Sequence, residues 1–421
     1  MSGIATFYLF SFASFLGHGM LGYSVVIYTQ SAFESELLSG GAFFAMNAPL
    51  ILIGFYAGTI ADRVPRRQLL ILSNGICLAA VVAVWLLVSL GRIPHFEWLL
   101  IGTLSGYGLS FAFIPPARFA MLGDLRRGAE LERATVYLTM LNMIGFGSAP
   151  MVVGWTLGAS SWAVMFGVLA CVWAIASLSL FSVSRPASRT GGATAPQASA
   201  SADLRAGLRF IVAEPVVWQL CLVTLLVVTL TFGPYQVLVP AFGAEVLGLS
   251  EAQRGTLMAA FGVGLILGGS AAIPLTSFSN RGWLILGAAL GTGISIGLLP
   301  VATGAWLGAG LLTSAGFCGG LAAALIPASM QAVTPDSMRG RVMSINAMIL
   351  GGFPAVGALL AGALSHGIGL RASIHTAGAL GICVALVSAV ALPQLRNIRS
   401  DAAPAEDPVR FLDEIPLNIE T

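Results

Sequence analysis

Long apolar stretches alternate with short polar segments along the whole chain. Each stretch has about 20 residues, which is enough for a helix to cross about 30 Å of hydrocarbon. We predict twelve spans, and the first six are residues 5–28, 41–61, 68–90, 98–121, 135–157 and 161–183. The other six are residues 215–242, 256–277, 283–303, 305–330, 342–364 and 370–392. All should be helices, because lipid offers no partners for the edges of open sheets.

The composition independently indicates a membrane protein. Hydrophobic residues make up 57% of the 421 residues and charged residues 9%, whereas ordinary soluble domains have about 45–50% and about 25%. A soluble chain of this length could not cover its surface with so little charge. We predict that the first stretch stays as a helix and is not a cleaved signal peptide, because Met1–Thr6 lacks a basic residue and further spans follow.

The basic residues predict the orientation, and all of them are arginine. Seventeen arginines fall in the segments after the even-numbered spans, whereas Arg92, Arg254 and Arg371 fall on the opposite side. Because basic loops stay in the cytoplasm, both chain ends are predicted to be cytoplasmic. The net charge of +2 therefore reflects topology and does not indicate nucleic-acid binding.

The chain divides into two apolar halves at a segment rich in Ser, Pro, Gly and Ala. We expect an N-terminal six-helix bundle (1–183), a cytoplasmic linker with a short amphipathic helix (184–214), a C-terminal six-helix bundle (215–393) and a cytoplasmic tail (394–421). In the linker, Leu204, Leu208 and Ile211 share one helical face, as in a helix that lies at the lipid headgroups. A plain surface helix is the alternative.

The two halves contain similar short motifs at equivalent places. Ile114-Pro115-Pro116-Ala117 at the end of the fourth span corresponds to Ile326-Pro327-Ala328 at the end of the tenth. Gly145-Phe146 in the fifth span corresponds to Gly352-Phe353 in the eleventh. Each offset is about half the chain, which is typical of a duplicated unit arranged as parallel repeats. Two half-molecules with a cavity between them are the expected result.

A compact charged motif lies between the second and third spans: Gly58-Thr-Ile-Ala-Asp62-Arg63-Val-Pro65-Arg66-Arg67. It resembles the loop Gly-x-x-x-Asp-Arg-x-Gly-Arg-Arg/Lys of the major facilitator superfamily, with Pro65 in place of the second glycine. The resemblance implies an all-α membrane protein with twelve transmembrane helices in two pseudo-symmetric six-helix bundles. Segments 116–118, 203–210 and 338–344 are similar to the branch that contains bacterial siderophore exporters and macrolide efflux proteins.

The charged motif and its resemblance predict a conformational switch on the cytoplasmic side. Its predicted members are Gly58, Asp62, Arg63, Arg66, Arg67, Arg118, Asp124, Arg339 and Arg341. When the halves close there, we expect Asp62 to bind the start of the eleventh helix near Arg341, or to pair with Arg66 or Arg118. A carboxylate at a helix N-terminus contributes about 0.3–1 kcal/mol. A solvated turn without a gating role is the alternative.

A second motif lies in the fifth span. Gly145, Pro150 and Gly154 resemble the glycine-proline motif of drug antiporters, although Ala149 and Val153 stand where glycines are usual. This resemblance favours export.

Polar side chains in the middle of the spans are the candidates for substrate binding or coupling. They are His18, Tyr23, Asn47, Tyr107, Tyr137, Asn142, Gln219, Tyr235, Gln236 and Asn346. Since no Asp or Glu falls inside a span, His18 is the deep side chain whose charge changes near neutral pH. A packing role for His18, coupling through an outer carboxylate such as Glu34 or Glu36, and a substrate that carries its own charge are the alternatives.

Cysteine and histidine patterns give no sign of cofactor chemistry. Cys77, Cys171, Cys221, Cys318 and Cys383 fall singly within the spans, so we expect small buried apolar residues and neither disulfides nor metal ligands. The four histidines are isolated, and the chain has no Gly-x-Ser-x-Gly motif and no phosphate loop. We therefore expect no metal, no cofactor and no enzymatic activity.

The expected function is secondary active export of a small metabolite, siderophore or drug across the inner membrane, coupled to protons. An importer or lipid-moving transporter of the same fold is the main alternative, since a fold fixes neither direction nor cargo. A membrane-embedded receptor or enzyme is the third. The expected partners are a small-molecule substrate, protons and the lipid bilayer, with no nucleic acid, and the chain is expected to act as a monomer.

Single cysteines at Ser199 and Ala403, in a variant without the five native cysteines, test the predicted orientation. Both sites should be shielded from a membrane-impermeant thiol reagent in intact cells and should react after permeabilisation, because they lie on the arginine-rich side. Labelling of either site in intact cells would overturn the orientation.

Overall fold

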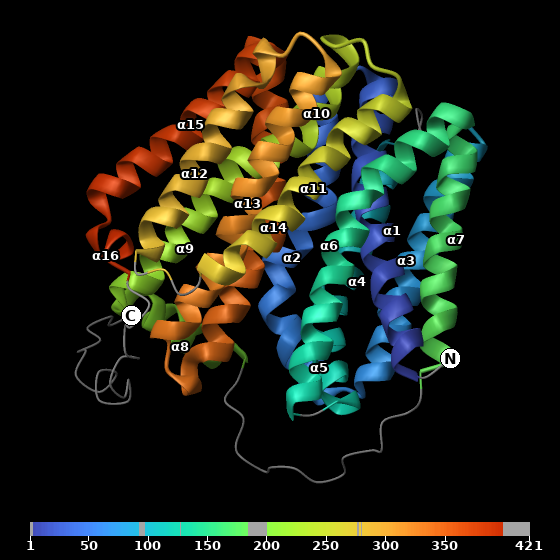
Figure 1. Ribbon diagram of the computed structural model, residues 1–421. Coiled ribbons are helices and arrows are strands. Elements are labelled where there is room, and N and C mark those ends of the chain that lie inside the picture. The colour runs from blue at the N-terminus through green and yellow to red at the C-terminus, as the bar shows by residue number, and fades with distance from the viewer. Residues whose placement is uncertain are drawn as a thin grey trace, which may run out of the picture.

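The computed structural model describes residues 3–91, 97–126, 128–183, 200–275, 278 and 280–398. The regular structure of this part of the chain is helical, and 12 of its helical segments are long and apolar enough to cross a membrane. Figure 1 shows them as two bundles that stand side by side. The prediction of an all-α membrane protein with twelve crossing helices is confirmed.

The first bundle contains seven helices. They are α1 (Gly3–Phe33), α2 (Glu36–Arg63), α3 (Arg66–Ser89), α4 (Glu97–Phe111), α5 (Ile114–Leu125), α6 (Gly128–Ala159) and α7 (Trp162–Phe181). The fourth crossing, which we predicted as one helix, is broken between α4 and α5. Pro115 and Pro116 explain the break, because a proline lacks the N–H that a helix interior needs but is accepted in a first turn.

The second bundle follows a short helix, α8 (Ala200–Ala213). Its elements are α9 (Pro215–Val227), η2 (Val228–Phe232), α10 (Gly233–Glu245), α11 (Glu251–Leu275), α12 (Arg281–Leu298), η3 (Leu299–Val301), α13 (Ala305–Val333), α14 (Asp336–Ile368), α15 (Leu370–Ala391) and α16 (Pro393–Arg396). The seventh crossing thus consists of α9 and α10 joined by a π-helical turn, η2.

Glycine lets the helices approach to backbone contact. α11 packs most extensively on α13, where a Cβ atom placed on Gly268 would lie 1.9 Å from the carbonyl oxygen of Phe317. A Cβ atom on Gly316 would lie 2.0 Å from the carbonyl oxygen of Phe261. Lipid tails are as apolar as leucine, so helix association in a membrane depends on such close packing.

Part of the α8 face that we predicted to lie at the lipid headgroups packs on protein instead. Phe210 and Ile211 are each 6% exposed, whereas Leu208 is 44% exposed. A Cβ atom on Gly207 would lie 3.1 Å from the Cβ atom of Arg341 on α14. Ile211 does not face the headgroups as predicted, because it packs in the buried apolar cluster of the second half.

The expected tail does not begin at Gln394. Leu395 is fully buried, and its N–H donates to Gln219 Oε1 at 2.7 Å. Gln219 also donates to Gln394 Oε1. Gln219, predicted to face the substrate cavity, instead fastens α16 to α9, so that assignment is corrected. The rest of the expected tail, residues 399–421, lies outside the described residues, as do residues 184–199 of the linker.

The prediction that all five cysteines are buried is wrong for two of them. Cys77 and Cys221 are buried and Cys318 is half-buried, but Cys171 and Cys383 are exposed on the surface of the bundles. A thiol behaves as a small hydrophobic group, so a position that faces lipid accepts it as readily as a packed one.

A valine at Gly316 tests the backbone contact between α11 and α13. Gly316→Val should lower the melting temperature of the purified protein, since overpacking costs about 1–3 kcal/mol. Gly310→Val is the matched control on the same helix, because a Cβ atom at Gly310 meets nothing within 4 Å. Equal melting temperatures of the two variants in detergent would contradict the packing described above.

Candidate functional site

The two halves meet along two pairs of long helices, α2 with α14 and α6 with α11. We call the end where α1 passes to α2, at Phe33–Glu36, the upper end, and the end where α2 passes to α3, at Arg63–Arg66, the lower end. These names follow the view of Figure 1. The second half has its α10–α11 connection, Glu245–Glu251, at the upper end as well.

α6 and α11 touch through small residues near the upper end. A Cβ atom on Gly154 would lie 2.5 Å from the carbonyl oxygen of Glu251, and one on Gly262 would lie 2.8 Å from the Cα atom of Gly147. A Cβ atom on Gly158, one turn further up, would lie 3.2 Å from that of Ala252. Gly154 of the predicted helix-five motif thus lies at a contact between the halves. Gly145 packs instead on α1 within the first half.

α2 and α14 make their close contact in their upper and middle parts, where a Cβ atom on Gly352 would lie 3.2 Å from the backbone nitrogen of Ile51. A Cβ atom on Gly40 would lie 2.5 Å from the carbonyl oxygen of Ala358, and one on Gly362 would lie 2.3 Å from that of Glu36. In the lower part of α2, exposed side chains recur at every fourth position: Leu52 (73%), Tyr56 (41%) and Ile60 (39%). The lower part of α6 is similar, with Tyr137 59%, Met140 47% and Ile144 44% exposed. The close contacts between the halves thus occupy the upper and middle parts of these helices, and side chains of α2 and α6 farther down are exposed.

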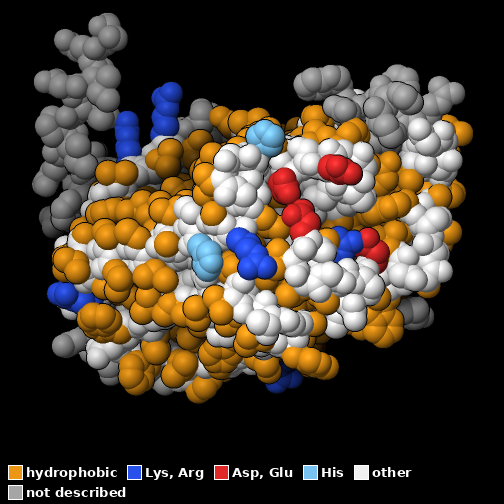
Figure 2. All heavy atoms as spheres, turned by 90° about the horizontal axis from the view of Figure 1, so that it is seen from above, with side chains coloured by type: hydrophobic (Ala, Val, Ile, Leu, Met, Phe, Trp, Pro, Cys, Tyr) orange, Lys and Arg blue, Asp and Glu red, His pale blue; other side chains and the backbone are white. Residues whose placement is uncertain are grey.

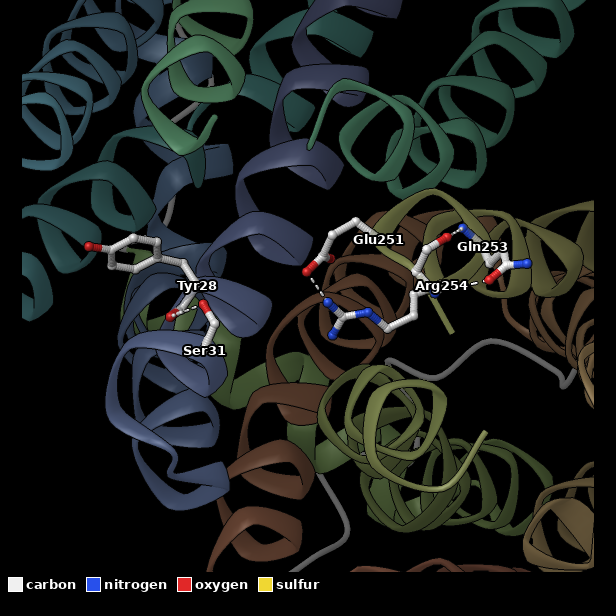
Figure 3. Close-up of polar contacts among 6 residues, drawn as sticks. Tyr28, Ser31, Glu251, Gln253 and Arg254 are labelled. Atoms are coloured by element: carbon white, nitrogen blue, oxygen red, sulfur yellow. Dashed lines mark hydrogen bonds and ion pairs between the residues drawn. The ribbon is translucent and has the colours of Figure 1, made fainter. Parts of the chain in front are cut away.

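Two polar contacts reinforce the upper closure. Gln30 Nε2 donates to the carbonyl oxygen of Val237 at 2.9 Å, which joins α1 to α10. Trp155 Nε1 donates to Thr256 Oγ1 at 3.2 Å, which joins α6 to α11. Figure 3 shows the start of α11 beside the end of α1, with the side chains of Glu251 and Arg254 directed toward each other as an ion pair.

At the lower end, Arg66 and Arg67 of the predicted switch make contacts with residues of the first half. Arg66 Nη1 donates to Asp124 Oδ1 at 2.6 Å and to the carbonyl oxygen of Ala120 at 3.0 Å, which joins α3 to α5. Arg67 donates to the carbonyl oxygen of Phe181 at 3.0 Å. Gly58, Asp62 and Arg63 belong to the last turns of α2, but the surroundings of these three positions lie outside the described part of the structure. The predicted pairing of Asp62 therefore stays a prediction.

Arg339 and Arg341 lie at the start of α14. Arg339 donates to the carbonyl oxygen of Gln331 at 3.4 Å, and Arg341 contacts Met338 Sδ at 3.3 Å. Both of these contacts lie within the second half. Their predicted role in a closed lower end stays a prediction.

Arg118 lies inside the first bundle and is 1% exposed. Its guanidinium lies 4.2 Å from the ring centre of Phe15 and donates to Asn142 Oδ1 at 2.8 Å. A buried cation over an aromatic face gains roughly 2 kcal/mol when desolvated. We assigned Arg118 to the lower switch and Asn142 to the cavity, and the structure brings these two residues together. Both assignments stay predictions.

His18 lies in an aromatic cluster of the first half. Its ring stacks on Phe111 with a centroid distance of 3.8 Å, and its Nδ1 lies 3.1 Å from the hydroxyl oxygen of Tyr107. The glycines on either side of His18 let neighbouring helices pack closely, since a Cβ atom on Gly17 would lie 2.6 Å from Trp173 Nε1. The structure thus joins two predicted residues, His18 and Tyr107, in one hydrogen-bonded stack.

A cavity of about 170 Å³ lies in the second half. Its lining comes from α9, η2, α10, α11, α12, α13 and α14, and it includes the predicted residues Tyr235 and Asn346. Tyr235 donates to the carbonyl oxygen of Met258 at 3.1 Å. Asn346 is 2% exposed, and its Oδ1 has no hydrogen-bond partner.

The remaining predicted residues do not join this cavity. Asn47 is 7% exposed and donates to the carbonyl oxygen of Phe43 on its own helix. Tyr23 is buried near the upper end, where the charges of Glu251 and Arg254 act on it. Gln236 is half-buried, and Tyr137 is the exposed residue described on α6.

Sequence reasoning missed the π-helical turn at Val228–Phe232, which supplies Val228, Thr231 and Phe232 to the cavity. The signal was Gly233-Pro234 in the middle of an apolar span. Proline has no N–H to donate one turn back, and membrane helices compensate by local π or 3₁₀ adjustments. Single-turn π-bulges occur frequently at functional sites.

Comparison with known proteins agrees with this architecture. The family model described as Major Facilitator Superfamily matches residues 7–313 and 237–417. The enterobactin exporter EntS of Escherichia coli (strain K12) is 27% identical over 411 residues, covering 93% of this chain and 92% of the relative. The enterobactin exporter EntS of Shigella dysenteriae serotype 1 is 27% identical over 414 residues with the same coverage.

Two solved structures share the fold. A bacterial homologue of the human lysosomal transporter Spinster, in an inward-facing and occupied conformation, has a TM-score of 0.75 at 16% identity and covers 96% of this chain and 98% of its own. A POT family transporter in complex with a thioalcohol-conjugated peptide has a TM-score of 0.75 at 11% identity and covers 93% and 96%. Since the family model spans far more than half of a chain with twelve crossing helices, the protein belongs to the Major Facilitator Superfamily of membrane transporters.

Proposed function

We propose that the protein exports a small amphiphilic molecule across the cytoplasmic membrane by alternating access. The observation that carries this proposal is the unequal contact between the halves: α6–α11 and α2–α14 touch through glycine near the upper end, while their lower parts expose side chains. A second state would need only to exchange these contacts for a lower closure. The free-energy difference between two such states sets their populations. Cargo and coupling ions shift these populations by binding one state more tightly than the other.

The charge distribution supports placing the lower end in the cytoplasm. Glu34, Glu36, Glu245 and Glu251 all lie at upper helix ends or connections, and Figure 2, which views the molecule from above, shows acidic side chains near the middle of that face. Among the described arginines, Arg66 and Arg67 at the start of α3, Arg281 at the start of α12, and Arg339 and Arg341 near the start of α14 lie at lower helix ends, and basic segments stay in the cytoplasm. In this orientation the conformation is open to the cytoplasm, as the loading state of an exporter would be.

The similarity to enterobactin exporters over more than nine-tenths of both chains supports a siderophore or another small metabolite as cargo. Gly154 of the helix-five motif lies at the α6–α11 contact between the halves, and the motif's resemblance to that of drug antiporters supports export. For the lower closure, we retain Gly58, Asp62 and Arg63 as the proposed switch. The Arg66–Asp124 pair would hold their supporting helices, α3 and α5, together.

Transport in everted membrane vesicles tests direction and cargo together. Vesicles that contain the protein should take up labelled enterobactin when a pH gradient, acid inside, is imposed, and vesicles without the protein should not. Uptake by right-side-out vesicles alone would indicate import. Uptake of drugs from a panel by everted vesicles, without uptake of enterobactin, would support export and change the proposed cargo.

A disulfide across the upper end tests the alternating contact. Cysteines at Gly158 and Ala252 suit this purpose, since a Cβ atom at Gly158 would lie 3.2 Å from that of Ala252, slightly short of the roughly 3.5–4.5 Å of natural disulfides. Oxidation of Gly158→Cys/Ala252→Cys in a cysteine-free background should abolish most transport, and reduction should restore it. Either single variant is the control. Full transport by the crosslinked protein would refute the exchange of upper contacts.

We propose His18 as a contributor to proton coupling. The His18–Tyr107 contact places a titratable ring and a hydroxyl side by side at mid-membrane depth, and an ionisable group at that depth in a transporter is a functional candidate. A purely structural role of the aromatic stack is the competing explanation, since a hydrogen bond between membrane helices contributes only about 0.6 kcal/mol on average.

Comparison of His18→Gln and His18→Ala with the parent separates these roles. Glutamine keeps a hydrogen-bonding group but does not take up a proton, so both variants should lose most of the response of transport to an imposed pH gradient in proteoliposomes. If only His18→Ala is impaired, and only in thermal stability, packing is the whole role of the ring. Coupling would then pass to Glu34 or Glu36.

A further inference from the structure

We infer that the second bundle contains a binding site of its own, which takes an uncharged planar group, such as one substituted aromatic ring, that donates a hydrogen bond to Asn346. The inference rests on the proposed function only in treating this group as part of the cargo. The site is the cavity lined by α9 to α14, and every helix that lines it belongs to the second half.

One wall of the cavity is a stack of three aromatic rings. Tyr235 and Phe261 lie 4.3 Å apart between ring centres at an interplanar angle of 28°, and Phe232 lies 5.7 Å from each. All three residues line the cavity. Aromatic rings prefer offset-stacked or edge contacts with further rings, worth about 0.5–1.5 kcal/mol beyond area burial. The wall therefore favours a flat, apolar partner.

The polar groups of the lining are satisfied, with one exception. Thr224, Thr231 and Thr292 each donate to the carbonyl oxygen four residues earlier on the same helix, and Tyr235 donates to Met258. Asn346 Oδ1 alone is buried in the lining without a partner. A buried polar atom without a hydrogen bond costs about 1–3 kcal/mol, which a ligand donor at this point would recover.

The first half shows what an asparagine of a long helix can bind, although Asn142 is half-buried and does not stand at the position equivalent to Asn346. In the first half, Asn142 on α6 receives a hydrogen bond from the flat guanidinium of Arg118, which follows Pro116-Ala117. In the second half, Pro327-Ala328 is followed by Ser329. Ser329 is fully buried, and its hydroxyl has no partner either. A planar donor that the chain supplies in one half is thus missing in the other.

Size and charge define the ligand further. The volume of about 170 Å³ is comparable to an engineered cavity of about 150 Å³ that binds benzene, so one substituted ring fits and a larger molecule places only part of itself here. None of the described lining residues is charged. An ionised ligand group would lose its hydration without compensation, which excludes carboxylates from this site.

Fluorine NMR of small probes tests the site on the purified protein in lipid nanodiscs, with no gradient applied. The probes are 4-fluorophenol, 4-fluorotoluene and 4-fluorobenzoate. The parent should bind the phenol and the toluene but not the benzoate. Asn346→Leu should weaken phenol binding about five- to tenfold, the effect of one hydrogen bond, and leave toluene binding unchanged. The unchanged toluene signal also shows that this variant is folded.

A cavity-filling pair of variants assigns the binding to this cavity. Ala323→Leu places three additional carbon atoms in the lining and should remove the specific binding of both neutral probes. Ala379→Leu, at an exposed position of α15 outside the cavity, should change neither and corrects for partition of the probes into lipid.

Equal phenol binding by the parent and Asn346→Leu, or unchanged binding by Ala323→Leu, would overturn the site. Because this measurement needs no transport, its failure is distinct from a failure of export. Loss of vesicle transport with normal probe binding would reject the exporter proposal and keep the site.

Discussion

Backbone contact through glycine is the constraint on which the rest of this structure depends. In lipid there is no hydrophobic driving force for apolar helices to associate, so their association depends on close packing. α11 shows this on two sides: Gly264 and Gly268 touch α13 within the second half, while Gly255 and Gly262 touch α6 of the first half. The same helix therefore holds its own bundle together and closes the upper end of the molecule. Its contacts with α13 continue farther down than those with α6, which lets the halves separate below.

The sequence predicted the architecture because length and apolarity are sufficient evidence for a crossing helix. Twelve spans, the repeat and the family followed from features that do not depend on which side of a helix faces inward. The interruptions at Pro115-Pro116 and at Gly233-Pro234 were visible as residues, but their outcomes differ. One breaks the helix and the other widens a turn, and the choice depends on neighbouring helices that the sequence does not place.

The site was harder to predict for a related reason. A helix that is apolar all round does not reveal its rotation, so a polar residue at mid-span has several possible partners. Arg118 donates a hydrogen bond to Asn142 and lies over the ring of Phe15 within its own bundle. Gln219 accepts a hydrogen bond from the backbone N–H of Leu395. Tyr235 and Asn346 do line a cavity, while His18 and Tyr107 bind each other. Mid-span polarity thus identified buried residues but not their partners.

The lining of the cavity by a single bundle has a thermodynamic consequence. A group held only by α9 to α14 keeps its contacts whichever way the halves are tilted, so its affinity is the same in both states. A ligand with equal affinity for two states shifts nothing between them, however tightly it binds. For a cargo anchored there to drive the exchange of upper for lower contacts, another part of the same molecule must touch the first half. Cargo length, rather than the fit of one ring, would then decide which molecules are bound passively and which are moved.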